Sequence, residues 1–348
     1  MPAPEAAIVL DGLRKSFGTK NALDDLTLEM PAGQVFGLLG PNGAGKTTAV
    51  RIITTLLAPD AGRVLVDGTD VTVDPGRVRR SIGVSGQYAA VDDKLTGFEN
   101  LYLVAKLYGM RRHRAATIAR DMLDRFHLGD VADQLTCTYS GGMRRRLDLA
   151  GALVASPAVV VLDEPTTGLD PQSRLDTWDV IGELVREGTT VLLTTQYLEE
   201  ADQLADRIAV IDHGTVVAEG TSDQLKAATG GHRLEVVTAH DTDLATAYRV
   251  LAAIGTTPSV DRRARRVEVA VTDGQRALET AVIRLNTERV PVLDLGLRRA
   301  TLDDVFLGLT GSAPARTAHT DPDQTAVLPA VPHWPTQSGA LDRREASA

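Results

Sequence analysis

The sequence has little or nothing of three features that would each point to a particular class of protein. It contains one cysteine, Cys137, which excludes an internal disulfide framework and any zinc or iron–sulfur site built from several cysteines. Its net charge of −9 argues against non-specific binding to nucleic acid, and we expect no nucleic-acid partner. No apolar run approaches the roughly 18 residues that span a bilayer, so we expect no direct membrane span.

The rest of the composition is that of an ordinary globular protein, with 43% apolar and 24% charged residues over 348 positions. This length allows two domains, or one large domain with an appendage. The single cysteine favours a reducing compartment, and the amino-terminal residues lack the regions of a signal peptide. We therefore expect a cytosolic chain whose contact with a membrane is peripheral or made through a partner.

Residues 1–230 alternate short apolar runs with helical patterns, which predicts an α/β domain. Continuous apolar runs, typical of strands buried on both faces of a parallel sheet, lie at 34–39, 158–162 and 190–194. Edge strands are expected at 8–13, 63–67 and 215–219. Strand signals stop between about 88 and 156, where helices at 97–108, 114–126 and 142–155 predict an inserted helical subdomain.

The pair Gly230-Gly231 predicts a joint between two domains. Residues 231–311 then read as a strand at 233–238, a helix near 244–254, a strand at 266–271, a helix near 275–285, a strand at 290–295 and a short helix from Leu302. This order resembles a split βαβ, ferredoxin-like unit, so we expect a small α+β accessory domain there. Residues 312–348 are rich in proline, threonine, alanine and glutamine without apolar periodicity, and are predicted to be a disordered tail.

A phosphate-binding loop is the most specific motif of the chain. The residues Gly40-Pro41-Asn42-Gly43-Ala44-Gly45-Lys46-Thr47 fit the P-loop pattern at every fixed position, and Thr48 continues the expected contact surface. The motif follows an apolar strand and precedes a helical pattern, which is the context that a P-loop requires. Backbone N–H groups and the helix N-terminus would hold the phosphates, Lys46 would reach the β- and γ-phosphates, and Thr47 would bind Mg²⁺. The predicted cofactors are ATP and Mg²⁺.

Two carboxylates end a strongly apolar run at residues 159–164. In P-loop enzymes an acid at this strand end holds Mg²⁺, a role that we assign to Asp163. Adjacent residues of a strand point to opposite faces, but the chain can turn after the strand ends. Glu164 can then face the γ-phosphate and act as the general base that polarises the attacking water.

A second glycine pair, in Ser140-Gly141-Gly142, precedes that acidic strand. Ser140 can cap the helix that begins here, and the glycines allow backbone N–H groups to approach an anion closely. One triphosphate already occupies the P-loop. We therefore predict that Ser140, Gly141 and Gly142 hold the γ-phosphate of a nucleotide bound to another subunit, in a homodimer.

With these motifs the sequence resembles the ATP-binding cassette (ABC) ATPases, whose Ser-Gly-Gly signature lies between the P-loop and the acidic strand. The resemblance implies a P-loop NTPase fold with a helical subdomain. It also implies a magnesium- and nucleotide-contacting role for Gln87, a dimer-interface role for Asp170 in Gly168-Leu169-Asp170, and adenine stacking by Phe17. An ordinary packed ring is the alternative for Phe17, and a surface polar residue is the alternative for Gln87.

One departure from the family pattern lies in Thr194-Thr195-Gln196-Tyr197, where Gln196 stands at the position usual for the switch histidine. An amide can still donate to a phosphate oxygen, but it carries no titratable charge. Two interpretations follow: a working glutamine switch, with Gln196 in a catalytic role, or a weakened ATPase site. A regulator gated by nucleotide without turnover belongs to the second interpretation.

The stretch at residues 194–202 and the segment at 297–306 resemble the daunorubicin/doxorubicin-resistance branch of ABC exporter ATPases. This resemblance implies an ATP-hydrolysing subunit that works with a separate integral membrane permease to export a drug or antibiotic-like compound. It also implies a peripheral location at the cytoplasmic face of the cell membrane. The alternatives are an ABC importer ATPase and a soluble ABC ATPase outside transport.

Overall fold

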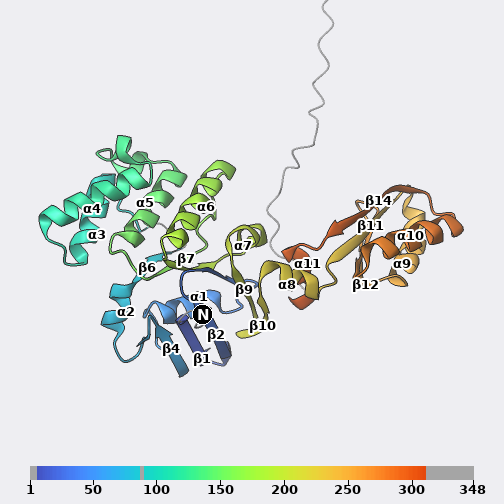
Figure 1. Ribbon diagram of the computed structural model, residues 1–348, viewed down its shortest axis with the longest axis horizontal. Helices are drawn as coiled ribbons and strands as arrows, with labels where there is room; N and C mark the ends of the chain where they lie inside the picture. Colours follow the sequence, from blue (N-terminus) through green and yellow to red (C-terminus); the bar gives the residue numbers. More distant parts are fainter. Residues whose placement is uncertain (1–5, 87–89, 311–348) are drawn as a thin grey trace, which may run out of the picture. The chain divides into compact units, whose positions relative to one another are not determined.

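The amino-terminal strands form a four-stranded antiparallel sheet in the computed structural model, which describes residues 6–86 and 90–310 (Figure 1). The predicted tail at 312–348 lies outside the described residues. In spatial order the strands are β2 (Lys20–Pro31), β1 (Ala6–Phe17), β4 (Ala61–Val66) and β5 (Thr69–Asp70). Strand β1 pairs with β2 on one side and with β4 on the other.

A second sheet has six strands, of which five are parallel and β10 is antiparallel to its neighbour. Their spatial order is β10 (Thr215–Gly220), β9 (Arg207–Asp212), β3 (Val35–Leu39), β8 (Thr190–Thr194), β7 (Val159–Asp163) and β6 (Ile82–Ser85). This order confirms the α/β fold and its buried strands. Strands β2 and β9 were not predicted from the sequence.

Both faces of the parallel sheet are buried, because successive residues of its strands enter two different hydrophobic cores. Phe36 and Leu38 pack in the core shared with the antiparallel sheet, whereas Val35 packs in the core below the helices. Val161 and Val160 of β7 divide in the same way. The continuous apolar runs of the sequence thus reflect two covered faces.

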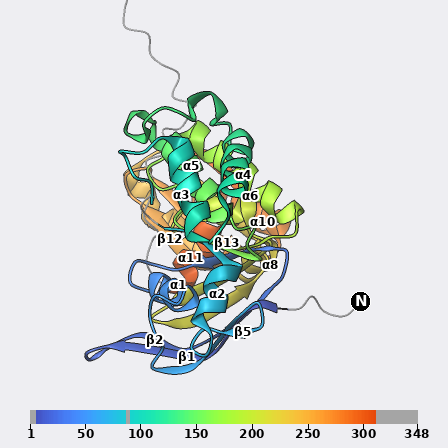
Figure 2. The same ribbon diagram turned by 90° about the vertical axis from the view of Figure 1, so that its left-hand side faces the viewer.

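The helices of the α/β part differ in length. They are α1 (Lys46–Ile53), α2 (Pro75–Ser81), α3 (Gly97–Leu107), α4 (Arg112–Arg125), α5 (Gly141–Leu153), α6 (Pro171–Arg186), α7 (Leu198–Leu204) and α8 (Ser222–Ala228), with short 3₁₀ turns at Gly129–Val131 and Thr136–Thr138. Figure 2 shows α3, α4, α5 and α6 in the upper part of the molecule, with α1 and α2 between them and strands β1 and β2. Helices α3, α4 and α5 correspond to the three helices predicted between residues 97 and 155. Helix α3 begins with a capping box of Thr96 and Glu99, and α5 begins at the N-cap Ser140.

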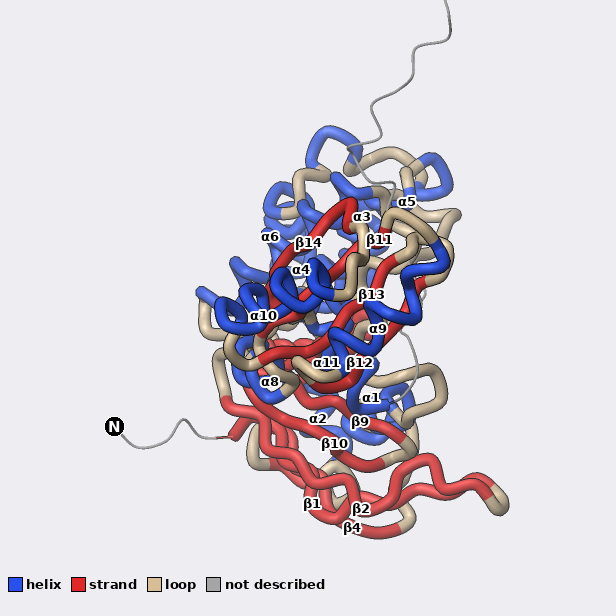
Figure 3. Tube along the Cα trace, turned by 90° about the vertical axis from the view of Figure 1, so that its right-hand side faces the viewer, coloured by secondary structure: helices blue, strands red, loops and turns tan. Residues whose placement is uncertain are grey.

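The carboxyl-terminal part contains a four-stranded antiparallel sheet with two helices against it (Figure 3). In chain order its elements are β11 (His232–Thr238), α9 (Leu244–Ala252), β12 (Thr256–Asp261), β13 (Arg266–Val271), α10 (Gly274–Thr287) and β14 (Val292–Arg299), with a 3₁₀ turn at Asp241–Asp243. The spatial order β12-β13-β11-β14 is that of a ferredoxin-like unit, as predicted. Strand β12 was not predicted from the sequence.

The last described helix, α11 (Leu302–Thr310), leaves this sheet and packs on α7 and α8. Leu302, Val305 and Phe306 share a hydrophobic core with Leu198 of α7 and Leu225 of α8. The carboxyl-terminal extension is therefore joined to the α/β part by a common apolar core as well as by the chain.

Candidate functional site

The P-loop connects β3 to α1, in the strand–loop–helix arrangement that the motif predicts. Asn42, Gly43 and Thr47 are exposed, Pro41 and Thr48 are half-buried, and Gly40, Ala44, Gly45 and Lys46 are buried. The amide of Ala44 donates to the carbonyl oxygen of Pro41 at 3.1 Å, which folds the loop back on itself. The loop thus presents an exposed tip and the N-terminus of a helix on one side of the sheet.

Steric contacts explain why two of the P-loop positions are occupied by glycine. A Cβ atom on Gly40 would lie 2.3 Å from the carbonyl oxygen of Ile211, on the neighbouring strand β9. Gly45 has a φ of 113°, and its Cβ would lie 2.6 Å from the carbonyl oxygen of Ala22. Any larger residue at either position would displace backbone, so the close packing of the loop depends on glycine.

Lys46 is buried, and its ammonium group is held by the loop itself. Its Nζ donates to the carbonyl oxygen of Gly40 at 2.5 Å and to that of Pro41 at 3.1 Å. Burial lowers the pKa of Lys46, while the nearby carboxylates of Glu164 and Asp163 act in the opposite direction. The structure therefore brings Lys46 together with both predicted acids, although they are more than 110 positions away in the sequence.

The two acids lie at the end of β7, beside β8. The hydroxyl group of Thr194 on β8 donates to the carboxylate of Asp163. Glu164 has a left-handed φ of 51°, and its amide donates to the carbonyl oxygen of Thr194 at 2.9 Å. The left-handed residue interrupts the strand alternation at the point where the sequence predicts a turn. Thr194 was not identified from the sequence, because its role depends on pairing between strands.

Gln196 lies two residues after the end of β8 and is half-buried. The next turn of the chain is fixed by buried polar groups: Trp178 Nε1 of α6 donates to Glu200 Oε1 of α7 at 3.2 Å. Burial raises the pKa of Glu200, and hydrogen bonds with Thr195 and its other neighbours partly offset that rise. These contacts hold α7, and with it the chain after Gln196, against α6.

The signature residues begin α5, at some distance in sequence from the acids but next to α6 in space. Ser140 Oγ accepts from the amide of Met143 at 3.2 Å, as an N-cap does. A Cβ on Gly142 would lie 2.4 Å from Ser173 Oγ of α6, whereas one on Gly141 would meet no described atom within 4 Å. Gly142 thus permits close helix packing, and Gly141 leaves open space above the helix N-terminus.

Asp170, predicted at a dimer interface, is the N-cap of α6 within the single chain. It accepts from Ser173 Oγ at 2.6 Å and from the amide of Ser173 at 3.0 Å, and these hydrogen bonds lower the pKa of Asp170. Phe17 ends β1 with 53% of its surface exposed, with Lys15 Nζ 5.8 Å from its ring centroid. The ring is therefore accessible to a planar ligand. Gln87 lies outside the described residues.

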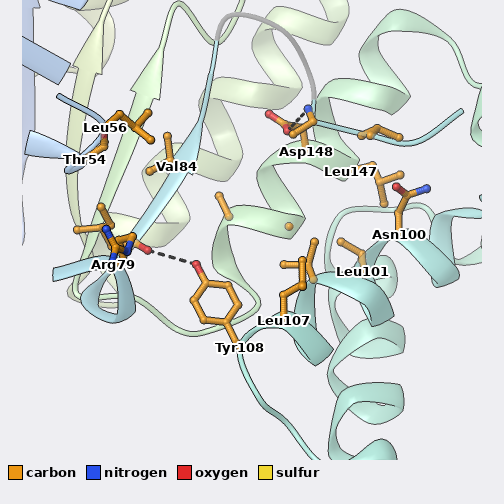
Figure 4. Close-up of a pocket in the computed structure, with 16 residues that line it drawn as sticks. Thr54, Leu56, Arg79, Val84, Asn100, Leu101, Leu107, Tyr108, Leu147 and Asp148 are labelled. Atoms are coloured by element: carbon orange, nitrogen blue, oxygen red, sulfur yellow. Dashed lines mark hydrogen bonds between the residues drawn. The ribbon is translucent and has the colours of Figure 1, made fainter. Parts of the chain in front are cut away.

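A pocket of about 450 Å³ opens between β6 and helices α3 and α5, and none of its described lining residues belongs to the motifs above (Figure 4). Its walls are mainly apolar, and exposed Leu56, Val84 and Leu107 contribute to them. Asp148 of α5 adds a buried carboxylate. Neither the pocket nor Asp148 was identified from the sequence, since the pocket walls come from distant segments.

Known proteins match this arrangement over most of the chain. Residues 23–167 match the family model described as ABC transporter. The daunorubicin resistance ATP-binding protein of Streptomyces coeruleorubidus is 52% identical over 307 residues, which cover 88% of this chain and 96% of that protein. The daunorubicin/doxorubicin resistance ATP-binding protein of Streptomyces peucetius is 49% identical over 309 residues, with 88% and 93% covered. The chain belongs to the ABC transporter ATP-binding proteins, in the daunorubicin-resistance branch.

A solved ABC cassette supports the same conclusion from the fold. It is a dimeric post-hydrolysis state bound to ADP and Pi, 26% identical, with a TM-score of 0.57 over 62% of this chain and 98% of that one. As an ABC ATPase, the chain binds and hydrolyses ATP. In residues 6–86 and 90–310, no helix combines the length and apolar character needed to cross a membrane.

Proposed function

We propose that this ABC ATPase is the ATP-hydrolysing subunit of an exporter that moves a drug or antibiotic-like compound through a separate membrane permease. The names of its relatives support this proposal, since two proteins about 50% identical to the chain are daunorubicin-resistance ATP-binding proteins. No corresponding observation favours an importer or a soluble ABC ATPase outside transport. We place the subunit peripherally at the cytoplasmic face of the cell membrane, through its permease.

The observation that carries the catalytic proposal is that Asp163 and Glu164 both bond Thr194 at the end of β8, and that the charges of both carboxylates act to raise the pKa of Lys46. Lys46 and the P-loop amides bind the phosphates of ATP, and Glu164 polarises the attacking water as the general base. The hydroxyl group of Thr47 and the carboxylate of Asp163 are hard oxygen ligands that fit Mg²⁺, with Gln87 as the third proposed contact. The ion would neutralise phosphate charge there. Gln196 is the proposed donor to the γ-phosphate.

A homodimer would complete each nucleotide site. The open space above Gly141 and the capped helix N-terminus at Ser140 leave the signature accessible to a phosphate held by a second copy. A solved relative in this fold family is dimeric with ADP and Pi bound. We propose that Ser140, Gly141 and Gly142 of one copy close over the P-loop of the other.

The apolar pocket is the proposed permease contact. Leu56 and Leu107 are 74% and 78% exposed at its edge, which is unusual for large apolar side chains unless another surface covers them. The pocket also lies next to Ala90, at the end of the segment that carries Gln87. An apolar helix of the permease in this pocket would therefore contact the chain three positions after Gln87.

The catalytic proposal is tested with Glu164→Gln, which keeps the shape of the side chain and removes its basicity. We expect loss of hydrolysis, retained ATP binding and accumulation of an ATP-bound dimer in size-exclusion chromatography. Glu187→Gln is the matched control, because Glu187 is exposed and contacts Arg125 rather than the P-loop. A Glu164→Gln protein that stays monomeric in saturating ATP, with its permease present, would contradict the dimer mechanism.

The permease proposal is tested by capture of the tagged chain from detergent-solubilised native membranes. A multi-spanning protein should copurify and change the ATPase rate. Leu107→Asp should abolish that capture, whereas Leu293→Asp, at an exposed position of β14, should not. Capture of ribosomes, or of the chain alone, would contradict the exporter assignment and leave the ATPase intact.

A further inference from the structure

Helix α5 carries a buried ion pair one turn beyond the signature. Arg145 and Asp148 have side chains that are only 7% and 4% exposed, and Arg145 Nη1 lies 3.4 Å from Asp148 Oδ2. Burial of two charges is unfavourable unless each also has hydrogen-bond partners. The partners of this pair lie on the backbone segments that flank the catalytic motifs.

Asp148 holds both ends of the segment between β6 and residue 90. Ser85 Oγ, at the end of β6, donates to Asp148 Oδ2 at 2.5 Å, and the amide of Ala90 donates to Asp148 Oδ1 at 2.8 Å. The carboxylate also lines the pocket, where Figure 4 draws it beside the labelled Leu147. One carboxylate thus contacts the pocket and fixes the chain on either side of residues 86–89.

Arg145 extends these contacts to the acidic strand. Its Nη1 donates to the carbonyl oxygen of Gly86 at 2.6 Å, and its Nε donates to the carbonyl oxygen of Pro165, the residue after Glu164, also at 2.6 Å. The planar guanidinium therefore joins two loops that are about 80 residues apart in the sequence. A lysine ammonium is a single point donor and reproduces this fork poorly.

The surrounding carboxylates favour the charged form of the Arg145 side chain. Burial lowers the pKa of Arg145, and the attraction of Asp148, Glu200 and Asp163 opposes that effect. The charge of Asp163, the proposed magnesium ligand, thus acts on Arg145 through space. The guanidinium is held in place by Asp148 and by the carbonyl oxygens of Gly86 and Pro165.

We propose that Arg145 and Asp148 are positioning residues that join the pocket wall and the chain at 86 and 90 to the backbone that orients Glu164. Displacement of Ala90 by an occupant of the pocket would pull on Asp148, and through Arg145 on Pro165. The pair would in this way make the catalytic rate depend on what lies in the pocket. This proposal rests on the assignment of Glu164 as the general base.

The first test is steady-state ATPase kinetics of the full chain carrying Asp148→Asn or Arg145→Lys. Each variant changes the pair but leaves the P-loop as it is, so KM for ATP should stay within about twofold of wild type. The value of kcat should fall about tenfold or more, because misplacement of a catalytic group by fractions of an ångström has effects of this order. A merely structural defect would lower the fraction of protein that binds ATP, and the apparent kcat would fall with it at unchanged KM. The value of kcat is therefore expressed per ATP-binding site, with the sites of each variant counted by nucleotide titration; a kcat that returns to wild type after this correction would overturn the proposal.

The second test is hydrogen–deuterium exchange, which needs no catalysis. Among the described residues, Asp148 forms hydrogen bonds with Ser85, Ala90 and Arg145, and of these three Arg145 also bonds the backbone after β7. Asp148→Asn should therefore disturb that backbone through Arg145. The amides of Glu164, Thr167 and Leu169, which donate to Thr194, Glu164 and Thr166, should exchange several-fold faster in this variant. Exchange that rises at residues 82–92 alone would overturn the proposal.

The matched control is Arg125→Lys, which makes the same substitution in an arginine that contacts a carboxylate elsewhere. Arg125 Nη2 lies 2.8 Å from Glu187 Oε2, at a surface position away from both loops. It should leave kcat, KM and the exchange of both segments within about twofold of wild type. Unchanged kcat in both Asp148→Asn and Arg145→Lys would also overturn the proposal.

The two proposals fail in distinguishable ways. If Glu164 is not the base, Glu164→Gln retains hydrolysis, while the exchange result for Asp148→Asn can still show the connection between the loops. If Arg145 and Asp148 only stabilise the structure around α5, Glu164→Gln is inactive, but the hydrogen–deuterium exchange of the amides after β7 does not change in Asp148→Asn. Neither outcome depends on identifying the permease.

Discussion

Two aspartates of this chain are buried beside arginines, and the two pairs have different structural roles. Arg145 and Asp148 lie on α5. Besides their contact with each other, they form hydrogen bonds with backbone groups of two loops, at Gly86, Ala90 and Pro165. Arg298 and Asp304 lie between β14 and α11, where Arg298 Nη1 donates to Asp304 Oδ2 at 2.6 Å. Arg233 Nε adds a second contact to Asp304 at 3.3 Å. The first pair joins loops, and the second joins a helix to a sheet.

The two carboxylates also differ in how well their charge is compensated. Burial raises the pKa of Asp148, and the hydrogen bonds from Ser85 and Ala90 together with Arg145 do not fully offset it. Burial also raises the pKa of Asp304, but Arg298, the Thr301 amide and Arg233 lower it by more. A well-compensated pair is typical of a fixed structural joint, whereas an under-compensated one is more common where geometry serves a function.

The largest expected effect on stability is at the structural pair. Asp304→Ala removes the carboxylate that faces Arg298 and the buried Arg233, and also the partner of Thr301 at the start of α11. We expect it to lower the free energy of unfolding by about 3–5 kcal/mol, the usual effect of leaving a buried charge without its partner. Asp294→Ala, at an exposed position of β14, is the control and should change it by less than about 0.5 kcal/mol. Urea denaturation of both variants measures the difference.

A smaller effect should distinguish the pairs by its dependence on pH. Because the pKa of Asp304 is lowered by folding, its stabilising contribution is present above about pH 4 and is lost as the pH falls through its folded pKa. Because the pKa of Asp148 is raised, wild type becomes less stable relative to Asp148→Asn as the pH rises above about 4.

The measurement is urea denaturation of wild type, Asp148→Asn and Asp304→Asn between pH 3 and 7. The difference between wild type and Asp304→Asn should shrink on acidification, and that between wild type and Asp148→Asn should move in favour of wild type. Arg145 is the charged group that faces Asp148, and Arg298 and Arg233 face Asp304. Equal slopes for the two variants would remove the distinction between the pairs.

The smallest effect is expected for an ion pair at the surface. Arg207 Nη2 lies 2.7 Å from Glu219 Oε1, but the two side chains are 44% and 31% exposed. Glu219→Gln should change the free energy of unfolding by less than about 1 kcal/mol, and high salt should reduce the effect further. A change as large as that of Asp304→Ala would show that burial does not set the order of these effects.

The sequence predicts the parts of the site whose chemistry is encoded by neighbouring residues. The P-loop needs eight consecutive positions, and Asp163 with Glu164 needs only a preceding apolar strand. The doubly buried strands are predicted as well, because both of their faces are apolar. The same criterion would also find β9, whose residues Ile208–Ile211 form a continuous buried apolar run.

Strand β2 is harder to predict, because its single buried face is interrupted. Leu23, Leu26, Leu28 and Met30 are buried, but Asp24 and Asp25 break the alternation, and Asp25 has a φ of 62°. A left-handed residue within a strand shifts its register, so the apolar period of two fails there.

The pair of Arg145 and Asp148 was not predicted for a different reason. In the sequence it belongs to a run of arginines on an amphipathic helix, which is typical of a solvated face. Its partners Ser85, Gly86, Ala90 and Pro165 lie between 20 and 63 positions away. Only the packing of α5 on β6 makes these side chains part of the interior.

The position of α11 has a practical consequence for dividing this protein. Its residues Leu302, Val305 and Phe306 cover Leu198 of α7 and Leu225 of α8, on the far side of the joint at Gly230. A chain cut at that joint would keep the whole ATPase sequence but would expose this apolar surface to water, beside the helix that follows Gln196. Helix α11 is therefore better regarded as a part of the ATPase hydrophobic core than as part of a removable module.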